Sequence, residues 1–114
     1  MLIAGCTGVP DLSGSWDVMM DPDYIGNPSV EHCVIQQEHR SLTMVCNGGG
    51  PEKALTGEVS RRSVNWGKQM PGKFTASWTG DVDASGTKIS GTWQLTLADG
   101  FEKHGKFTAS RLSR

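Results

Sequence analysis

Two of the three cysteines have a spacing that points to covalent chemistry. Cys33 and Cys46 lie in "EHCVIQQ" and "LTMVCNG", two alternating segments that flank the short polar turn "EHRS". If these segments pair as antiparallel strands about His39 and Arg40, Cys33 lies opposite Cys46, and cross-strand neighbours can approach closely enough for a disulfide. Two buried, reduced thiols are the alternative. We predict the disulfide, which is typical of an exported protein.

The third cysteine, Cys6, ends the stretch "LIAGC". This stretch resembles the lipobox of bacterial lipoproteins, in which small residues precede a cysteine that is diacylated and becomes the first residue after cleavage. The resemblance implies lipidation at Cys6 and attachment to a membrane through that lipid only. Because Thr7 rather than Asp follows, it also implies a periplasm-facing outer-membrane lipoprotein of the bacterial cell envelope. A disordered apolar N-terminus with a free thiol is the alternative.

Patterns for metal, phosphate or acid-base chemistry are weak. The segment "DVDASG" (81–86) begins like a calcium loop, but Thr92 stands where a bidentate Glu is required. The glycines of "NGGG" (47–50) lack the lysine and following helix of a phosphate loop. Glu31 and His32 would point to opposite faces of a strand. We therefore predict no catalytic residue, metal or cofactor, and a protein that is not an enzyme.

Composition limits the architecture that can position these residues. The 11 basic and 12 acidic residues give a net charge of −1, which provides no reason to expect a nucleic-acid partner. The 15 glycines and 5 prolines, spread over 114 residues, indicate short strands joined by tight turns in one domain. We expect a lipobox remnant and tether over 1–11 and a β-barrel domain over 12–114.

A period-two alternation of apolar and polar residues divides the chain into eight expected strands. They cover residues 12–20, 31–37, 42–48, 54–60, 63–68, 72–82, 87–97 and 103–112. Eight antiparallel strands without a helix can close into an all-β up-and-down barrel, which removes exposed sheet edges. A two-sheet sandwich is the alternative.

Short turns between these strands would place bulky rings opposite glycine or alanine, as small barrels require. A four-residue turn through "DASG" (83–86) fixes one register, and a three-residue turn through "ADG" (98–100) fixes another. The pairs expected are Trp66 with Gly57, Trp78 with Gly91, Trp93 with Ala76, Ile89 with Gly80, and Phe107 with Gly91.

The two ends of the expected barrel resemble a known superfamily. Gly14 and Trp16 in the first strand, with Arg111 near the end of the last, are similar to the calycin pattern of lipocalins and avidins. The resemblance implies that the arginine packs on the tryptophan and closes the base of the barrel, so these three residues are structural. The segment "DVMMDPDY" lacks the polar residues with which avidins hold biotin, and full lipocalins are longer.

Two short segments, "LSGSW" and "EHC", are also similar to bacterial metalloprotease inhibitors of the alkaline protease type. Those inhibitors are small eight-stranded barrels with one disulfide, and they act through an extended N-terminal arm. Here "TGVPD" separates Cys6 from Leu12, which leaves a short arm.

The interior of an eight-stranded barrel is either filled by its side chains or holds one small ligand. We predict a non-catalytic, exported binding module for a small apolar ligand, with a periplasmic protein-interaction module or protease inhibitor as the alternative. The ligand-binding candidates are the inward rings of Trp66, Phe74, Trp78, Trp93 and Phe107. If the interior is filled, the contact candidates move to the loops and are Met19, Tyr24, Ile25 and Met70.

Overall fold

The computed structural model describes residues 9–22, 27–50 and 53–113. The candidates Cys6, Tyr24 and Ile25 lie outside these residues. None of the described segments forms a helix with the length and apolar character that crossing a membrane requires.

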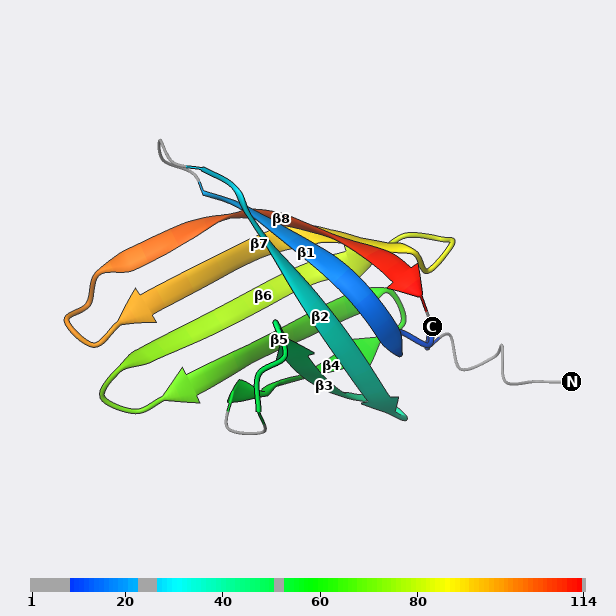
Figure 1. Cartoon of the computed structure of the whole chain (residues 1–114), viewed down its shortest axis with the longest axis horizontal. Helices are drawn as coiled ribbons and strands as arrows, with labels where there is room; N and C mark the ends of the chain where they lie inside the picture. The colour runs from blue at the N-terminus through cyan, green and yellow to red at the C-terminus, as the bar shows by residue number, and fades with distance from the viewer. Residues whose placement is uncertain (1–8, 23–26, 51–52, 114) are drawn as a thin grey trace, which may run out of the picture.

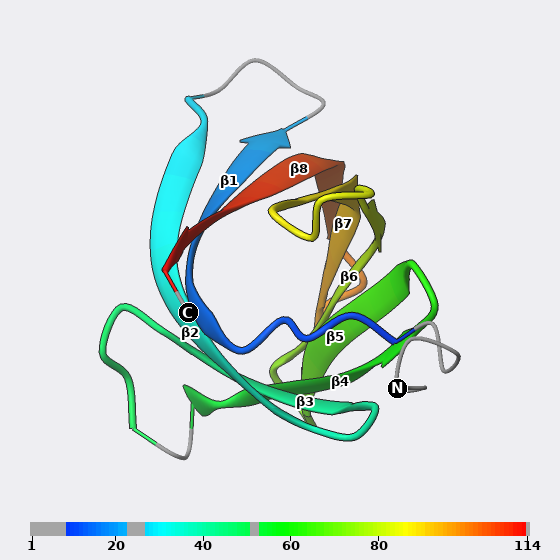
Figure 2. The same ribbon diagram turned by 90° about the vertical axis from the view of Figure 1, so that its right-hand side faces the viewer.

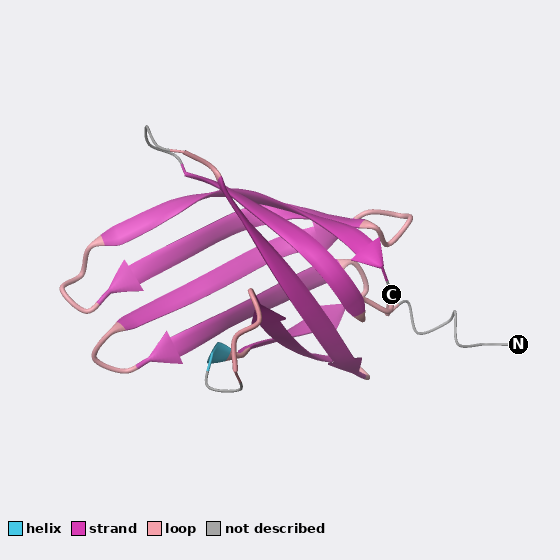
Figure 3. Cartoon of the chain, in the orientation of Figure 1, coloured by secondary structure: helices cyan, strands magenta, loops and turns pink. Residues whose placement is uncertain are grey.

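The described chain is a closed barrel of eight antiparallel strands (Figure 1). Each strand pairs with the next in sequence, and β8 returns to pair with β1. Turns and loops make the described connections, apart from a short piece of 3₁₀ helix at Lys53 before β4 (Figure 3). The predicted up-and-down barrel is therefore confirmed, and the sandwich is excluded. The strands are β1 (Gly14–Pro22), β2 (Ser29–Glu38), β3 (Ser41–Cys46), β4 (Leu55–Ser60), β5 (Ser63–Met70), β6 (Phe74–Val82), β7 (Lys88–Leu97) and β8 (Glu102–Ser113).

Alternation of side chains explains why these segments form strands with one face inside. In β6, Ala76, Gly80 and Val82 are buried, whereas the threonines, serine and aspartate between them are exposed. The expected strand over 72–82 starts two residues later because Gly72 lies in a turn at φ 76°. That left-handed conformation favours glycine, so Gly72 belongs to the β5–β6 turn and not to the strand.

The register of most hairpins follows the predicted turns. Cys33 lies opposite Cys46 in the β2–β3 pair, and the two form the predicted disulfide. Trp66 lies opposite Gly57 in the β4–β5 pair, as expected. Phe107 lies opposite Gly91 in the β7–β8 pair, also as expected.

The predicted β6–β7 register is wrong by two residues. Trp78 lies opposite Trp93, Gly80 opposite Gly91, and Ala76 opposite Leu95. Ile89 therefore faces Val82 and not Gly80. A bulky ring does not face a small residue in every pair, because two tryptophans lie side by side across these strands.

The carboxylate of Asp83 explains why the observed β6–β7 register differs from the predicted one. It accepts hydrogen bonds from the backbone N–H groups of Thr87 (3.0 Å) and Lys88 (3.2 Å). An aspartate that binds the backbone ahead of it stabilises a turn. Thr87 is therefore held in the loop, and the connection is longer than the four-residue turn that fixed the predicted register.

Glycine is required where the backbones of neighbouring strands approach closely. A Cβ atom added at Gly57 would lie 1.8 Å from the carbonyl oxygen of Asn65, and one added at Gly91 would lie 1.9 Å from that of Thr79. Both positions are inward, and the rings of Trp66 and Phe107 stand directly across from them. The glycines thus let the strands come together beneath the two rings.

Candidate functional site

The two ends of the barrel are built differently, and the end near the chain termini is closed. Figure 2 views this end, where the N-terminal segment 9–13 runs across the opening. The Leu12 N–H donates to Gln37 Oε1 at 2.8 Å, and Gln37 Nε2 donates to the carbonyl oxygen of Pro10 at 2.9 Å. Trp16 Nε1 donates to the carbonyl oxygen of Leu12 at 2.9 Å. Leu12 and Trp16 are both 0% exposed, so this segment seals the barrel.

Arg111 adds the contact that the calycin resemblance implies. Its guanidinium carbon lies 5.0 Å from the centroid of the Trp16 ring, and Nη2 donates to the carbonyl oxygen of Asp11. A cation over an indole face is attracted by the ring quadrupole, and more strongly when water is excluded. Gly14 begins β1 beside this contact. The closed end is therefore held by the first and last strands together.

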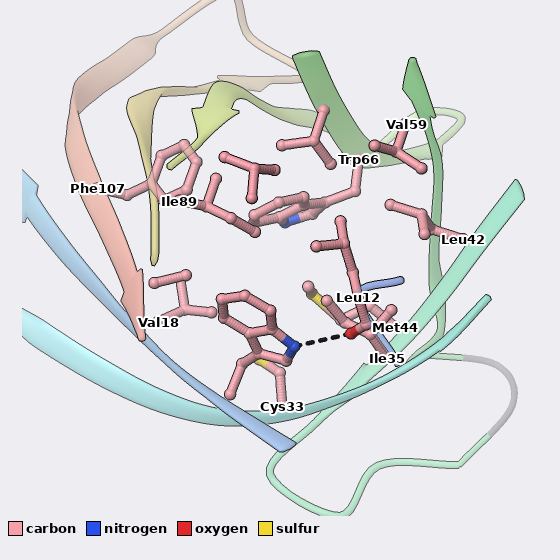
Figure 4. Close-up of a cluster of buried hydrophobic side chains, with 14 residues drawn as sticks. Leu12, Val18, Cys33, Ile35, Leu42, Met44, Val59, Trp66, Ile89 and Phe107 are labelled. Atoms are coloured by element: carbon pink, nitrogen blue, oxygen red, sulfur yellow. Dashed lines mark hydrogen bonds between the residues drawn. The ribbon is translucent and has the colours of Figure 1, made fainter. Parts of the chain in front are cut away.

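Above this seal the interior is filled with apolar side chains (Figure 4). The Trp66 and Phe107 rings, each 2% exposed, meet edge to face with centroids 5.2 Å apart. These two ligand-binding candidates therefore belong to the packed core. The buried core comprises Leu12, Trp16, Val18, Cys33, Ile35, Leu42, Met44, Val59, Val64, Trp66, Val82, Ile89, Phe107 and Ala109.

The opposite end of the barrel holds an open cavity of about 710 Å³. This volume lies within the range of roughly 300 to 1,000 Å³ that is typical of small-molecule sites. Three of the five ring candidates, Phe74, Trp78 and Trp93, line it, together with Met70 from the loop-contact candidates. The full lining is Met20, Glu31, Cys46, Asn47, Gly49, Lys53, Leu55, Lys68, Met70, Phe74, Ala76, Trp78, Trp93, Gln94, Leu95 and Lys103.

Trp78 connects the packed core to the cavity. Its ring stacks on Trp66 with centroids 6.2 Å apart and an interplanar angle of 16°. Its Nε1 lies 3.3 Å from the sulfur of Met20, which is another lining residue. Trp78 therefore contacts both the packed core and the side chains that line the cavity.

Trp93 carries a polar atom that the described residues leave without a partner. Its Nε1 is buried and has no hydrogen bond within the described part of the chain. A buried N–H without an acceptor costs free energy.

The cavity also contains charged side chains at inward strand positions. Lys68 lies opposite Ala76, and Lys103 lies opposite Leu95, and both partners also line the cavity. Glu31 lies opposite the buried Val18, so it also occupies an inward position. Burial raises the pKa of the Glu31 carboxyl. The wall of the cavity therefore carries charged as well as apolar side chains.

The sequence contained a signal for these charged residues. Inward residues recur at every second position of a strand. Glu31 occupies such a position before Cys33 and Ile35, and Lys68 occupies one after Val64 and Trp66. A charged residue in phase with a buried series usually marks the end of a core or a functional position. Our sequence reasoning followed only the apolar members of each series and so missed the cavity's charges.

Among the described residues, Met19 is the other loop-contact candidate, and it does not share a surface with Met70. Met19 is 47% exposed on the outer face of β1, where it lies opposite Val30, which is 52% exposed. Met70 lies inside the barrel at the end of β5. Within the described residues, no group of three metal-ligating side chains comes together.

Fold and site together define the class of the protein. It is a small, closed, up-and-down β-barrel that fits the calycin type, with one end sealed and an open apolar cavity at the other. No family model matches the sequence, and no curated protein matches it.

Proposed function

We propose that this protein is a non-catalytic binding module that holds one small, mainly apolar ligand in its open cavity. The observation that carries the proposal is the contrast between a packed, sealed half and a hollow half with aromatic walls. A barrel selected only for stability would fill both halves, because empty apolar space forfeits packing energy. The Trp78 and Trp93 rings would contact the ligand.

An exported, lipid-anchored location fits this proposal. The Cys33–Cys46 disulfide is of a kind that persists in oxidising compartments such as the periplasm. Lipidation at Cys6 would tether the barrel to a membrane, where apolar ligands are abundant. Labelling with a radioactive or alkyne-bearing fatty acid during expression, with Cys6→Ser as the control, tests the anchor.

The alternative is a periplasmic protein-interaction module or a protease inhibitor that acts through its loops. An inhibitor that acts through an extended N-terminal arm, as the resembled inhibitors do, is disfavoured by the closed end. Leu12 is fully buried, and its backbone is hydrogen bonded to Gln37. Residues 9–13 are thus part of the barrel's seal. A contact module that uses the exposed Met19 and Val30 would leave the cavity without a role.

Binding of the neutral fluorescent probe N-phenyl-1-naphthylamine tests the proposed function. We expect one probe per barrel, with a blue-shifted emission in the apolar cavity. Leu95→Trp fills the cavity and should abolish binding, whereas Thr92→Trp places the same side chain on the exposed face of the same strand and should not. Failure to bind, or equal binding by both variants, would overturn the proposal.

A further inference from the structure

Three lysines from separate parts of the chain converge on the cavity. Lys53 comes from the segment before β4, Lys68 from the end of β5, and Lys103 from the start of β8. We propose that the ligand is an anionic amphiphile, whose apolar chain lies among the rings and whose acidic head group is bound by these lysines. This inference rests on the proposed function, because it names the chemical class of that ligand.

The positions of Lys68 and Lys103 favour a head group at the rim. Both residues are half-buried at inward positions. A lysine at such a position packs its methylene stem on apolar neighbours while its ammonium group reaches toward water. Lys68 Nζ lies 3.4 Å from the carbonyl oxygen of Ala54, just outside the first residue of β4. The two stems therefore line the wall, and the charges lie toward the mouth.

The charge in the cavity has the opposite sign to that of the whole chain. Among the described lining residues, three lysines and one glutamate leave a formal charge of +2, whereas the chain as a whole carries −1. No ion pair joins Glu31 to Lys53 or Lys103 in the described part of the chain. A concave site with apolar walls focuses such a field and attracts an anion.

The side chains that line the cavity match both parts of such a ligand, the apolar chain and the head group. Met20 and Met70 have flexible thioether side chains that adapt to an irregular apolar chain. Ammonium groups form charge-assisted hydrogen bonds with carboxylate, sulfate or phosphate oxygens, which are stronger than neutral ones. An alkyl chain with one such head group uses all of these features.

Three ten-carbon probes test the inference on the unmodified protein: decanoate, decan-1-ol and decyltrimethylammonium. Isothermal titration at neutral pH measures the affinity of each. We expect decanoate to bind about tenfold more tightly than decan-1-ol, since three partly exposed ion pairs together supply about that factor. Decyltrimethylammonium should bind most weakly, and the preference for decanoate should shrink as salt is added.

Matched variants then locate the head group. The double variant K68Q/K103Q removes two of the three lysines, so it should lower decanoate affinity by about fivefold and leave decan-1-ol affinity unchanged. K88Q/K106Q removes the same charge from exposed positions in β7 and β8 outside the cavity and should change neither affinity.

The outcomes distinguish a failure of this inference from a failure of the proposed function. Equal affinity for decanoate and decan-1-ol, or tighter binding of the cationic probe, would overturn the anionic head group and leave an apolar carrier. An equal loss of decanoate affinity in K68Q/K103Q and K88Q/K106Q would show a general charge effect and would also overturn it. If none of the three probes binds, the proposed function itself fails.

Discussion

The closed and open halves of this barrel are built from the same eight strands, yet one is packed and the other is hollow. Strand length explains part of the difference: β3 and β4 have 6 residues each, whereas β7 has 10 and β8 has 12. Figure 1 shows the longer strands continuing past the short pair. At the closed end, Leu12 and Trp16 fill the space. At the other end, the strands surround the open cavity. One barrel can therefore be stabilised by a packed core at one end and still keep an open cavity at the other.

The largest expected effect is a difference in unfolding free energy between two tryptophan variants, one from each half of the barrel. Trp16→Ala should lower the free energy of unfolding by about 3 to 5 kcal/mol, because it leaves a cavity in a sealed core. Trp93→Ala should cost only about 1 kcal/mol, because it enlarges a cavity that already opens to solvent. Urea unfolding of both variants measures the difference. Similar losses would show that the open half is as important for stability as the closed half.

The disulfide joins the two halves, because Cys33 is buried in the core and Cys46 lines the cavity. Its removal in the double variant Cys33→Ala/Cys46→Ala should lower the free energy of unfolding by about 3 kcal/mol. The loop it closes spans 13 positions, and closing such a loop restricts the unfolded chain. Thermal unfolding of the parent with and without reductant gives an independent value. A shift in neither experiment would mean that the bond does not stabilise the fold.

Arg111→Met tests the closed end with a side chain of similar length. It removes the cation above Trp16 and the hydrogen bond to the Asp11 carbonyl. We expect a loss of about 1 to 2 kcal/mol in the free energy of unfolding. Binding of N-phenyl-1-naphthylamine at the far end should not change in the folded protein. Loss of probe binding without loss of stability would contradict the separation of the two ends.

The smallest expected effect is pH-dependent and belongs to Glu31 in the open half. Burial raises the pKa of its carboxyl, so the folded state holds the proton more tightly than the unfolded state does. Below the ordinary pKa of 4.5, both states are protonated and burial of the carboxyl carries no charge penalty. As the pH rises from 4.5 through the raised value, the unfolded state gains stability and the free energy of unfolding falls.

Glu31→Gln should remove this dependence. The variant should match the parent at a pH below 4.5 and be more stable than the parent at neutral pH. Urea unfolding at the two pH values measures this, with Glu58→Gln on the exposed face of β4 as the control. The charged groups that line the cavity with Glu31 are Lys53, Lys68 and Lys103, and they stay in both proteins. Equal pH profiles for parent and Glu31→Gln would show that this carboxyl is not linked to folding.

The β2–β3 hairpin shows what could be predicted from the sequence. Its turn is short and polar, and one register brings both apolar faces and both cysteines together. Such a hairpin is fixed by local spacing, because a one-residue slip would turn every side chain to the wrong face. The same reasoning accounts for the strand count and the barrel topology.

The β6–β7 hairpin shows where this reasoning fails. A shift of two residues preserves which face each side chain occupies, so the apolar pattern cannot distinguish the two registers. The hydrogen bonds that the Asp83 carboxylate accepts from the backbone N–H groups of Thr87 and Lys88 favour the observed register. The partners of Trp78 and Trp93 were therefore not predictable from alternation alone.

The cavity could be predicted only in part for a similar reason. Alternation identified Phe74, Trp78 and Trp93 as inward, but it could not tell a packed level of the barrel from a hollow one. That distinction depends on where the N-terminal segment crosses and on how far each strand extends. The alternation also placed Lys68 and Lys103 at inward positions. Their proposed role in ligand binding can now be tested.

The most direct test of the two-halves account uses the four tryptophans, whose indole N–H groups give separate signals in a ¹⁵N-labelled protein. Trp16 and Trp66 belong to the packed half, and Trp78 and Trp93 line the cavity. On titration with decanoate, the account predicts the largest shifts for Trp78 and Trp93, a smaller shift for Trp66, which stacks on Trp78, and none for Trp16. Shifts of similar size for all four, or a shift led by Trp16, would contradict it.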